Sequence, residues 1–406
     1  MADIEKLLTS IEDDEVIRVA RELVAIPSIT HREGMGMVRF MERWFKDLKI
    51  PVRIYPAGSS TSAANTSGCQ DGDRANFFAD WGATPGPGRF LFNGHMDTKP
   101  VEGMTVDPFA AEIRDGRMYG RGTCDMKGGL AALLCAFKAL VQAGFTPRSG
   151  ITFYSDIEEE WGGGGGYNWA RDNGLLDGFE GVISAEPTGL EVQIGCRGCY
   201  VAAFEVRGRT AHSGLAHLGV NAIIHAARFI NEYMELPYLT VRNPVFGTST
   251  CNFERIEGGS YLAAVPDRCV VCLDSRLIPE TPPEVVQGQV DGLLGRLRRE
   301  YGMDIRETEQ PKGWRENSGR SKSEHIPQDH PLTRRVADAV RKVTGAEAVI
   351  GGCPGIGFPT VVIERGTPAV LCGPGNAAQA HTEDEWVEIA QIPKAARVYA
   401  LLMAGM

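Results

Sequence analysis

The stretch FLFNGHMD, residues 90–97, is a short apolar run that ends in two ionisable side chains, His95 and Asp97. Three more apolar runs, at residues 151–154, 181–184 and 368–372, also lead into polar or ionisable residues. Short apolar runs that alternate with longer segments of helical spacing indicate a sheet with crossover helices. In such sheets the ligand crevice lies outside the carboxyl ends of the strands. We therefore expect the residues that follow the four runs to meet at one edge.

The middle of the chain has a different order of elements. The pattern predicts a strand, a helix, two strands, a helix and a strand at residues 200–206, 221–234, 250–256, 269–276, 283–300 and 304–307. This β-α-β-β-α-β order is that of a ferredoxin-like unit. We therefore predict an α/β domain, residues 1–195 and 310–406, with a mixed, mostly parallel sheet flanked by helices. A ferredoxin-like α+β domain, residues 196–309, is inserted into it.

Composition excludes several classes of protein. The 42 Lys and Arg against 52 Asp and Glu give a net charge of −10, without any basic run of five residues. The most apolar stretch, residues 128–144, is interrupted by Lys138 and too short to span a bilayer, and residues 1–18 are acidic where a signal peptide would be basic. Ten cysteines in 406 residues are too dilute for a disulfide scaffold. We expect a cytoplasmic protein with neither a nucleic-acid nor a membrane partner.

The predicted sheet edge gathers carboxylates, which repel one another and therefore require cations. Five residues, His95, Asp125, Glu160, Glu186 and His381, can hold two divalent ions. Each ion would have one histidine and one terminal carboxylate, and a third carboxylate would bridge the two. Such sites hold their ions about 3.5–4 Å apart and activate a water between them.

Two further acids would support this site. Asp97, two residues after His95 on the same side of an extended chain, would accept the second imidazole N–H and fix the tautomer. Glu159 stays outside the ligand set, and a free carboxylate beside an activated water is a general base.

At these residues the chain resembles the M20 metallopeptidase family, which includes acetylornithine deacetylase, succinyl-diaminopimelate desuccinylase and glutamate carboxypeptidases. The resemblance rests on GHMDT (94–98), YGRG (119–122), DMKGG (125–129), EE (159–160) before Gly162, AEPT (185–188), AHSG (211–214), GVNA (219–222), IEGG (256–259), VP (265–266), GPG (373–375) and HTEDE (381–385). These segments follow the family's order across nearly the whole chain.

The resemblance implies roles for the candidate metal ligands. One metal would be held by His95, Asp125 and Glu186, and the other by Asp125, Glu160 and His381. The metal is usually zinc, with cobalt or manganese also used. The resemblance also implies that Glu159 is the general base and that the peptide bond after Asp125 is cis.

The resemblance also implies roles for the inserted domain, as a lid and as the interface of a homodimer. Its His212 would reach the partner's active site to stabilise an oxyanion, and Arg276 would bind the carboxylate of a small-molecule substrate. The third-strand acid is typically Glu in the family's deacylases and glutamate carboxypeptidases, so Glu186 favours that group.

The predicted activity is hydrolysis of an amide C–N bond, namely deacylation of an N-acyl amino acid or related small carboxylate. A metal-bridging hydroxide would attack, with Glu159 as general base. A carboxypeptidase or dipeptidase and a hydrolase of non-peptide metabolites stay open, because Ala263 and the pair Cys353-Pro354 depart from the family's pattern. A catalytically inactive binding protein would be expected to have lost Glu159 or a metal ligand.

Three local patterns complete the prediction. GPGNAA at residues 373–378 fits a dinucleotide-binding fingerprint weakly, because residues 382–385 fit a capping box that would start the last helix. Serine-hydrolase chemistry would need a G-x-S-x-G motif, which is absent. The run Gly162–Gly166 is either a mobile wall beside the substrate or a tight packing turn.

Overall fold

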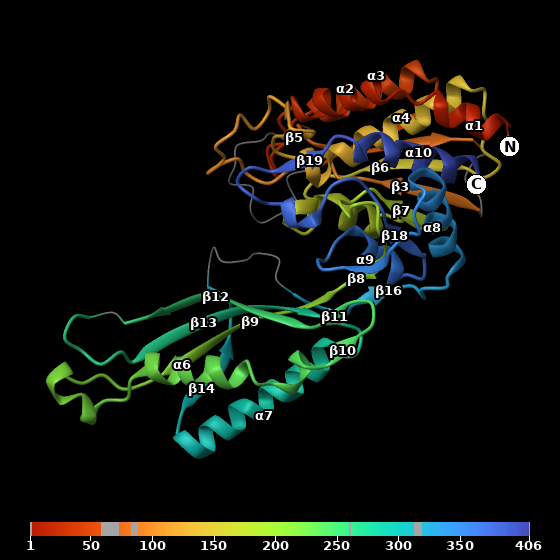
Figure 1. Cartoon of the computed structure of the whole chain (residues 1–406). Helices are drawn as coiled ribbons and strands as arrows, with labels where there is room; N and C mark the ends of the chain where they lie inside the picture. Colours follow the sequence, from red (N-terminus) through yellow and green to blue (C-terminus); the bar gives the residue numbers. More distant parts are fainter. Residues whose placement is uncertain (1, 58–72, 83–87, 260, 312–318, 406) are drawn as a thin grey trace. The chain divides into compact units, whose positions relative to one another are not determined.

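The computed structural model describes residues 2–57, 73–82, 88–259, 261–311 and 319–405, which form two compact units (Figure 1). Unit 1 comprises residues 1–195, 325–353 and 357–406, and unit 2 comprises residues 196–324 and 354–356. Unit 2 thus extends to Glu324, past the expected end of the insertion at residue 309. The reason is that β15 (Arg320–Ser321) pairs with a strand of unit 2.

Unit 1 is built on a mixed sheet, as predicted. Its strands run in the order β1 (Val52–Pro56), β2 (Ala75–Trp81), β6 (Ile151–Ser155), β3 (Arg89–Asn93), β7 (Phe179–Ser184), β18 (Ala369–Leu371), β8 (Val192–Cys196) and β16 (Glu324–His325), with β17 (Ile350–Cys353) beside β8. The central strands pair in parallel, β3 with β6 and β7, and β7 with β18. β2 pairs antiparallel with β1 and β6.

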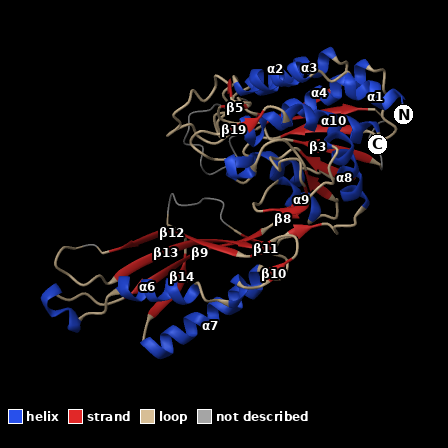
Figure 2. Ribbon diagram, in the orientation of Figure 1, coloured by secondary structure: helices blue, strands red, loops and turns tan. Residues whose placement is uncertain are grey.

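Helices cover both faces of this sheet (Figure 2). They are α1 (Ala2–Thr9), α2 (Asp13–Val24), α3 (Gly36–Asp47), α4 (Gly128–Gln142), α5 (Trp169–Asp172), α8 (Pro331–Thr344), α9 (Phe358–Ile363) and α10 (Gln391–Ala404). Phe153 of β6 packs against Phe137 of α4, whereas the next residue, Tyr154, packs against Phe358 of α9. Successive strand residues point to opposite faces, so one strand contributes to two cores. None of the helices in the described ranges combines the length and apolar character of a membrane span.

Unit 2 has the ferredoxin-like order that the sequence predicts. Its elements are β9 (Gly198–Arg207), α6 (Ala222–Tyr233), β12 (Thr250–Gly258), β13 (Arg268–Leu277), α7 (Pro283–Tyr301) and β14 (Asp304–Thr308). The strands lie in the order β12-β13-β9-β14 and pair antiparallel. Both helices pack on one face around Phe204 and Phe229, and a small hairpin, β10 (Arg242–Asn243) with β11 (Gly247–Thr248), completes the unit.

A three-stranded sheet in unit 1 joins two distant loops. It consists of β4 (Glu112–Arg114), β5 (Arg117–Tyr119) and β19 (Trp386–Glu388). The predicted capping box at residues 382–385 is therefore wrong, since the chain enters β19 after Glu385 and the last helix begins only at Gln391. The carboxylate of Glu385 accepts hydrogen bonds from the distant loop 121–125 instead of from a helix N-terminus.

The glycine run after β6 is a tight packing turn. The N–H of Gly165 donates to Glu158 Oε2 over 2.7 Å, and the main-chain oxygen of Gly165 accepts a bond from Asn76. A Cβ at Gly166 would lie 1.9 Å from the main-chain oxygen of Ile157. The backbone of this run therefore packs directly against the segment that leads to Glu159.

We expect Gly166→Ala to lower the free energy of unfolding by about 3 kcal/mol, because the new methyl group overlaps a main-chain atom that cannot move freely. Urea denaturation measures this loss. Gly351→Ala in β17 is the matched control, since its Cβ would meet only Glu191 Oε2 at an ordinary 3.6 Å. Equal stability of the two variants would show that the run is not tightly packed.

Candidate metal centre

The strand ends of unit 1 bring the five candidate ligands together. His95 follows β3, Glu160 lies in a short helical turn after β6, and Glu186 follows β7. His381 comes after β18, beyond the turn Ala377–Gln379. Asp125 lies in the segment Thr123–Lys127 that leads into α4. Because the central strands are parallel, their carboxyl ends meet at one edge, as the sequence predicts.

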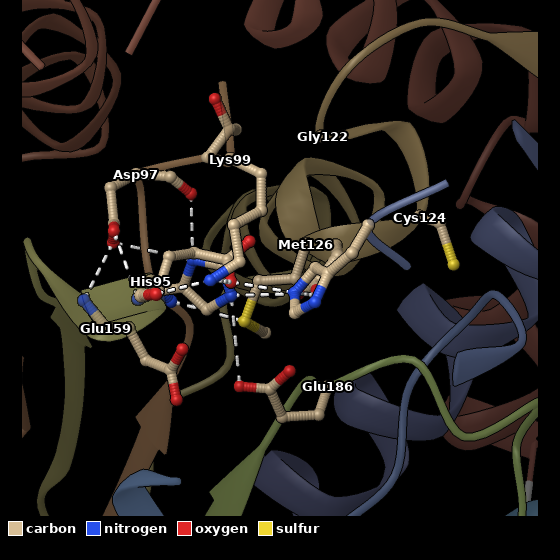
Figure 3. A network of polar contacts seen from close by, with 12 residues as sticks. His95, Asp97, Lys99, Gly122, Cys124, Met126, Glu159 and Glu186 are labelled. Carbon is tan, nitrogen blue, oxygen red and sulfur yellow. Dashed lines mark hydrogen bonds and ion pairs between the residues drawn. The ribbon is translucent and has the colours of Figure 1, made fainter. Parts of the chain in front are cut away.

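The carboxylate of Asp125 lies between the two histidines. His95 Nε2 is 2.9 Å from Asp125 Oδ1, and His381 Nε2 is 3.4 Å from Asp125 Oδ2. His381 Nε2 also lies 2.8 Å from Glu160 Oε2. Glu186 Oε1 is 4.0 Å from His95 Nε2, on the side of the imidazole away from Asp97 (Figure 3). Asp125 thus has the position expected of a bridging ligand.

The electrostatics of this cluster favour positive charge. Burial would lower the pKa of His95, but contact with Asp125 and Asp97 raises it well above its usual value. Burial opposes protonation of His381 too, yet Asp125 and Glu160 raise its pKa to about 9. The histidines lower the pKa of Asp125 in turn, against the effect of its burial. Protons on the imidazoles therefore balance the carboxylates.

The donor set fits divalent cations. One ligand atom each from His95, Asp125 and Glu160 lies within 4.8 Å of the others, a candidate metal site within the described part of the chain. Imidazole nitrogens and carboxylate oxygens are ligands that zinc accepts, and oxygen ligands also suit manganese. A cation here would replace the protons that the two histidines hold.

Asp97 has more partners than the sequence suggests. His95 Nδ1 lies 2.9 Å from the main-chain oxygen of Asp97 and 3.6 Å from its carboxylate. The carboxylate instead accepts the main-chain N–H groups of Glu159 and Glu160, at 3.1 and 3.2 Å, and the hydroxyl of Thr30. Asp97 thus fixes the ring of His95 through its backbone and fixes the Glu159-Glu160 pair through its side chain.

Glu159 stands beside the candidate ligands. Its side chain lies on the same side of His95 as Glu186 (Figure 3). Burial raises the pKa of Glu159 well above its usual value, His95 lowers it, and the neighbouring carboxylates of Glu160 and Asp125 raise it further. A carboxyl group with a raised pKa accepts a proton more readily than an ordinary one.

Two candidate ligands lie on unusual backbone. The peptide bond between Asp125 and Met126 is cis, which confirms what the resemblance implied. His381 has a φ of 63°, in the left-handed region that residues with a side chain rarely adopt. A left-handed backbone at such a residue is retained where the surroundings determine it, often at functional sites.

Sequence reasoning missed Lys99 and the residues around Glu158. Lys99 Nζ lies 3.2 Å from Glu160 Oε2 and donates to the main-chain oxygen of Glu160. Arg74 Nη1 bonds Glu158 Oε1 and lies 3.5 Å from Glu33 Oε2, within a buried cluster. Lys99 lies only four residues after His95, which could have suggested it, but no local pattern indicates a pairing between residues 74 and 158.

His212 and Arg276 belong to unit 2, so the metal centre described above is built by unit 1 alone. His212 is exposed and precedes a short helical turn, where its Nδ1 accepts the N–H of Gly214 over 3.1 Å. The guanidinium of Arg276, on β13, donates to Asp274 Oδ2 over 2.8 Å. Ala263, one of the departures from the family's pattern, accepts the N–H of Ser213 through its main-chain oxygen.

Comparison with known proteins identifies the family of this chain. The sequence profile described as peptidase family M20/M25/M40 matches residues 91–405. Acetylornithine deacetylase of Photorhabdus laumondii is 26% identical over 408 residues, which cover 95% of this chain and 96% of the relative. Succinyl-diaminopimelate desuccinylase of Dechloromonas aromatica is 26% identical over 401 residues, 96% of this chain and 98% of the relative.

Solved structures show the same fold. A tripeptidase from Staphylococcus aureus has a TM-score of 0.76 at 21% identity, covering 97% of this chain and 99% of that one. Human carnosine dipeptidase 1 has a TM-score of 0.75 at 17% identity, covering 99% of both chains. Since the family profile spans more than three quarters of the sequence, the chain belongs to peptidase family M20/M25/M40 and is a metal-dependent hydrolase of amide C–N bonds.

Proposed function

We propose that this enzyme removes the acyl group from an N-acyl amino acid or a related small carboxylate. The observation that carries the proposal is the convergence of five candidate ligands around Asp125, with the separate carboxylate of Glu159 beside them. Glu186 supports the deacylase group over the aminopeptidases, and the sequence relatives named above include a deacetylase and a desuccinylase.

His95, Asp125 and Glu186 would hold one divalent ion, and Asp125, Glu160 and His381 the other. Zinc is the ion we propose, with cobalt or manganese as substitutes, because the donors are nitrogen and oxygen. Such ions supply Lewis-acid activation of a water and of the amide carbonyl. The ligand side chains then need only keep their positions. Asp97 and Lys99, which are not ligands, support the position of Glu160 through hydrogen bonds and an ion pair.

Glu159 would move the proton in the reaction. Its carboxylate would take a proton from the attacking water and give it to the departing amine nitrogen. The carboxylate of Asp97 accepts the main-chain N–H of Glu159. This bond would keep the Glu159 carboxylate beside the ligands without making it one of them. The raised pKa of Glu159 suits a group that must both accept and return a proton.

His212 would donate a hydrogen bond to the oxyanion that forms on the substrate carbonyl. Its Nδ1 accepts a hydrogen bond from the main chain of Gly214, so the proton of the neutral imidazole is on Nε2. An exposed imidazole with its proton on Nε2 is a form that can donate to a developing negative charge. Its position in unit 2 supports a role in a partner subunit's active site.

The partner we propose is a second copy of the chain, bound through unit 2. Strand β12 is an edge strand whose residues are mostly exposed. The loop after β12 contacts Ser213, whose N–H donates to the main-chain oxygen of Ala263. The same loop carries Tyr261 and Leu262, which are 81% and 100% exposed. Unpaired strand edges and clustered exposed apolar residues are typical of association surfaces.

Arg276 would bind the substrate carboxylate. Asp274 orients its guanidinium from the same strand, and a guanidinium can form two parallel hydrogen bonds to a carboxylate. A carboxypeptidase or dipeptidase would also use such a residue. The departures at Ala263 and Cys353-Pro354 keep that second candidate open, and substrate tests must separate the two.

The first test is a substrate panel with zinc, cobalt or manganese. We expect N-acetyl, N-succinyl or N-formyl amino acids to have kcat/KM values at least about tenfold above those of dipeptides and of amides without a carboxylate. Removal of metal by a chelator should abolish the activity, and added metal should restore it. Faster turnover of dipeptides would favour the peptidase, and full activity after complete metal removal would refute the metal mechanism.

The second test concerns the proton carrier. Glu159→Gln should lower kcat by about 10³-fold while bound metal, measured by elemental analysis, stays at the native level. The amide keeps the size of the side chain but cannot accept the proton. Glu347→Gln, at an acid whose side chain is 88% exposed, serves as the control and should be unchanged. Near-native kcat in Glu159→Gln would remove this residue from the mechanism.

The third test concerns the dimer. We expect His212→Ala and Glu159→Gln to be inactive alone, and mixed dimers of the two to regain one complete site. That site combines the native Glu159 of one chain with the native His212 of the other. Differently tagged chains, co-expressed and purified in sequence, isolate the mixed dimers. If these form without recovery of activity, His212 does not act across the interface.

A further inference from the structure

We propose that Glu385 is a positioning residue that holds three ligand-bearing segments of the metal centre in register. The inference rests on the proposed metal site, to which it adds a residue outside the ligand set. Glu385 is 1% exposed and lies four residues after His381. No ligand atom of the centre comes from it, yet its carboxylate is fully engaged.

The carboxylate of Glu385 accepts four hydrogen bonds. Oε2 accepts from Arg121 Nη1 at 2.8 Å and from the N–H of Gly122 at 3.1 Å. Oε1 accepts from the N–H groups of Cys124 and Asp125, at 2.8 and 3.0 Å. A carboxylate offers about four acceptor positions, so all are used. The loop that presents Asp125 is thus folded around one side chain from the His381 segment.

Arg121 extends the connection to a third segment. Its Nε donates to the main-chain oxygen of Pro100, over 3.0 Å, on the segment that begins with His95. Glu385 also bonds the backbone of the loop through its own main-chain oxygen, which accepts the N–H of Gly120 over 3.0 Å. The pair of Arg121 and Glu385 therefore joins the segments of His95, Asp125 and His381.

The adjacent residue provides a matched control. Asp384 accepts from the N–H groups of Thr105 and Val106 and from the hydroxyl of Thr105. None of these partners belongs to the loop of Asp125. Asp384→Asn is accommodated there, because its amide N–H can donate to the hydroxyl oxygen of Thr105 while its oxygen keeps the main-chain bonds.

Glu385→Gln cannot be accommodated in this way. Both carboxylate oxygens face N–H donors, so the amide nitrogen meets a donor whichever way the side chain is turned. We expect the full-length variant to bind Co²⁺ and Zn²⁺ at least about tenfold more weakly than the native chain, by competition with a chromophoric chelator. Asp384→Asn should stay within about threefold of the native affinity.

A second readout is independent of metal. In the full-length, metal-free chain, the amides of Cys124 and Asp125 should exchange with deuterium faster in Glu385→Gln than in Asp384→Asn. Equal metal affinity and equal exchange in the two variants would overturn the proposal. If the native chain itself binds no divalent metal, the proposed function fails, while the exchange comparison still decides the role of Glu385.

Arg121→Gln is an alternative test if Glu385→Gln does not fold. Its shorter amide keeps one donor for Glu385 but loses the bond to Pro100. We expect metal affinity between those of the native chain and of Glu385→Gln, with a changed d–d absorption spectrum of bound Co²⁺. A native affinity and spectrum in this variant would contradict the connection between the three segments.

Discussion

The mutual repulsion of buried carboxylates is the constraint on which the structure of the metal centre depends. Two like charges about 4 Å apart interact by about 4 kcal/mol at an effective dielectric constant of 20, a large part of a protein's net stability. The closely placed carboxylates of Asp125, Glu160 and Glu186 therefore need positive partners. Protonated His95 and His381 meet that need in the absence of metal, and burial raises the pKa of Glu186 well above its usual value. Metal ions satisfy the same requirement, so the site is arranged for cations before any cation arrives.

Acidic residues around this centre fall into two groups with different partners. Asp125, Glu160 and Glu186 direct oxygens toward imidazoles and toward one another. Asp97 and Glu385 instead accept hydrogen bonds from main-chain N–H groups of the loops that carry the ligands. Hydrogen bonds to the backbone satisfy a buried carboxylate and at the same time fix the path of the chain. The geometry of the ligands therefore follows from carboxylates that are not ligands.

The sequence could predict those features that depend on local pattern. Alternating apolar runs located β3, β6, β7 and β18, and the residues that follow them gave the set around Asp125. The partners of Glu385 could not be predicted from the sequence. The local pattern Thr382–Glu385 matches a helix cap, whereas the hydrogen bonds of Glu385 are made to residues more than 250 positions away. The glycine run Gly162–Gly166 shows the same limit. Its composition fits a mobile loop, and only the packing of Gly166 on Ile157 identifies it as a tight turn.

The division of the chain separates the candidate metal ligands from the two residues that we propose to contact the substrate. All five candidate ligands and Glu159 come from unit 1, whereas His212 and Arg276 come from unit 2. The metal ligands must keep their geometry closely, because a misplaced donor loses coordination, and unit 1 holds them through buried bonds. The geometry of the proposed substrate-binding residues on unit 2 is less strictly constrained, since a substrate can be bound by several arrangements of donors. Of the departures from the family's pattern, Ala263 and Pro354 lie in unit 2 and Cys353 lies at the boundary in unit 1, while all five candidate ligands are present in unit 1. These departures leave the donor set unchanged, so they bear on the proposed substrate and not on the candidate ligands.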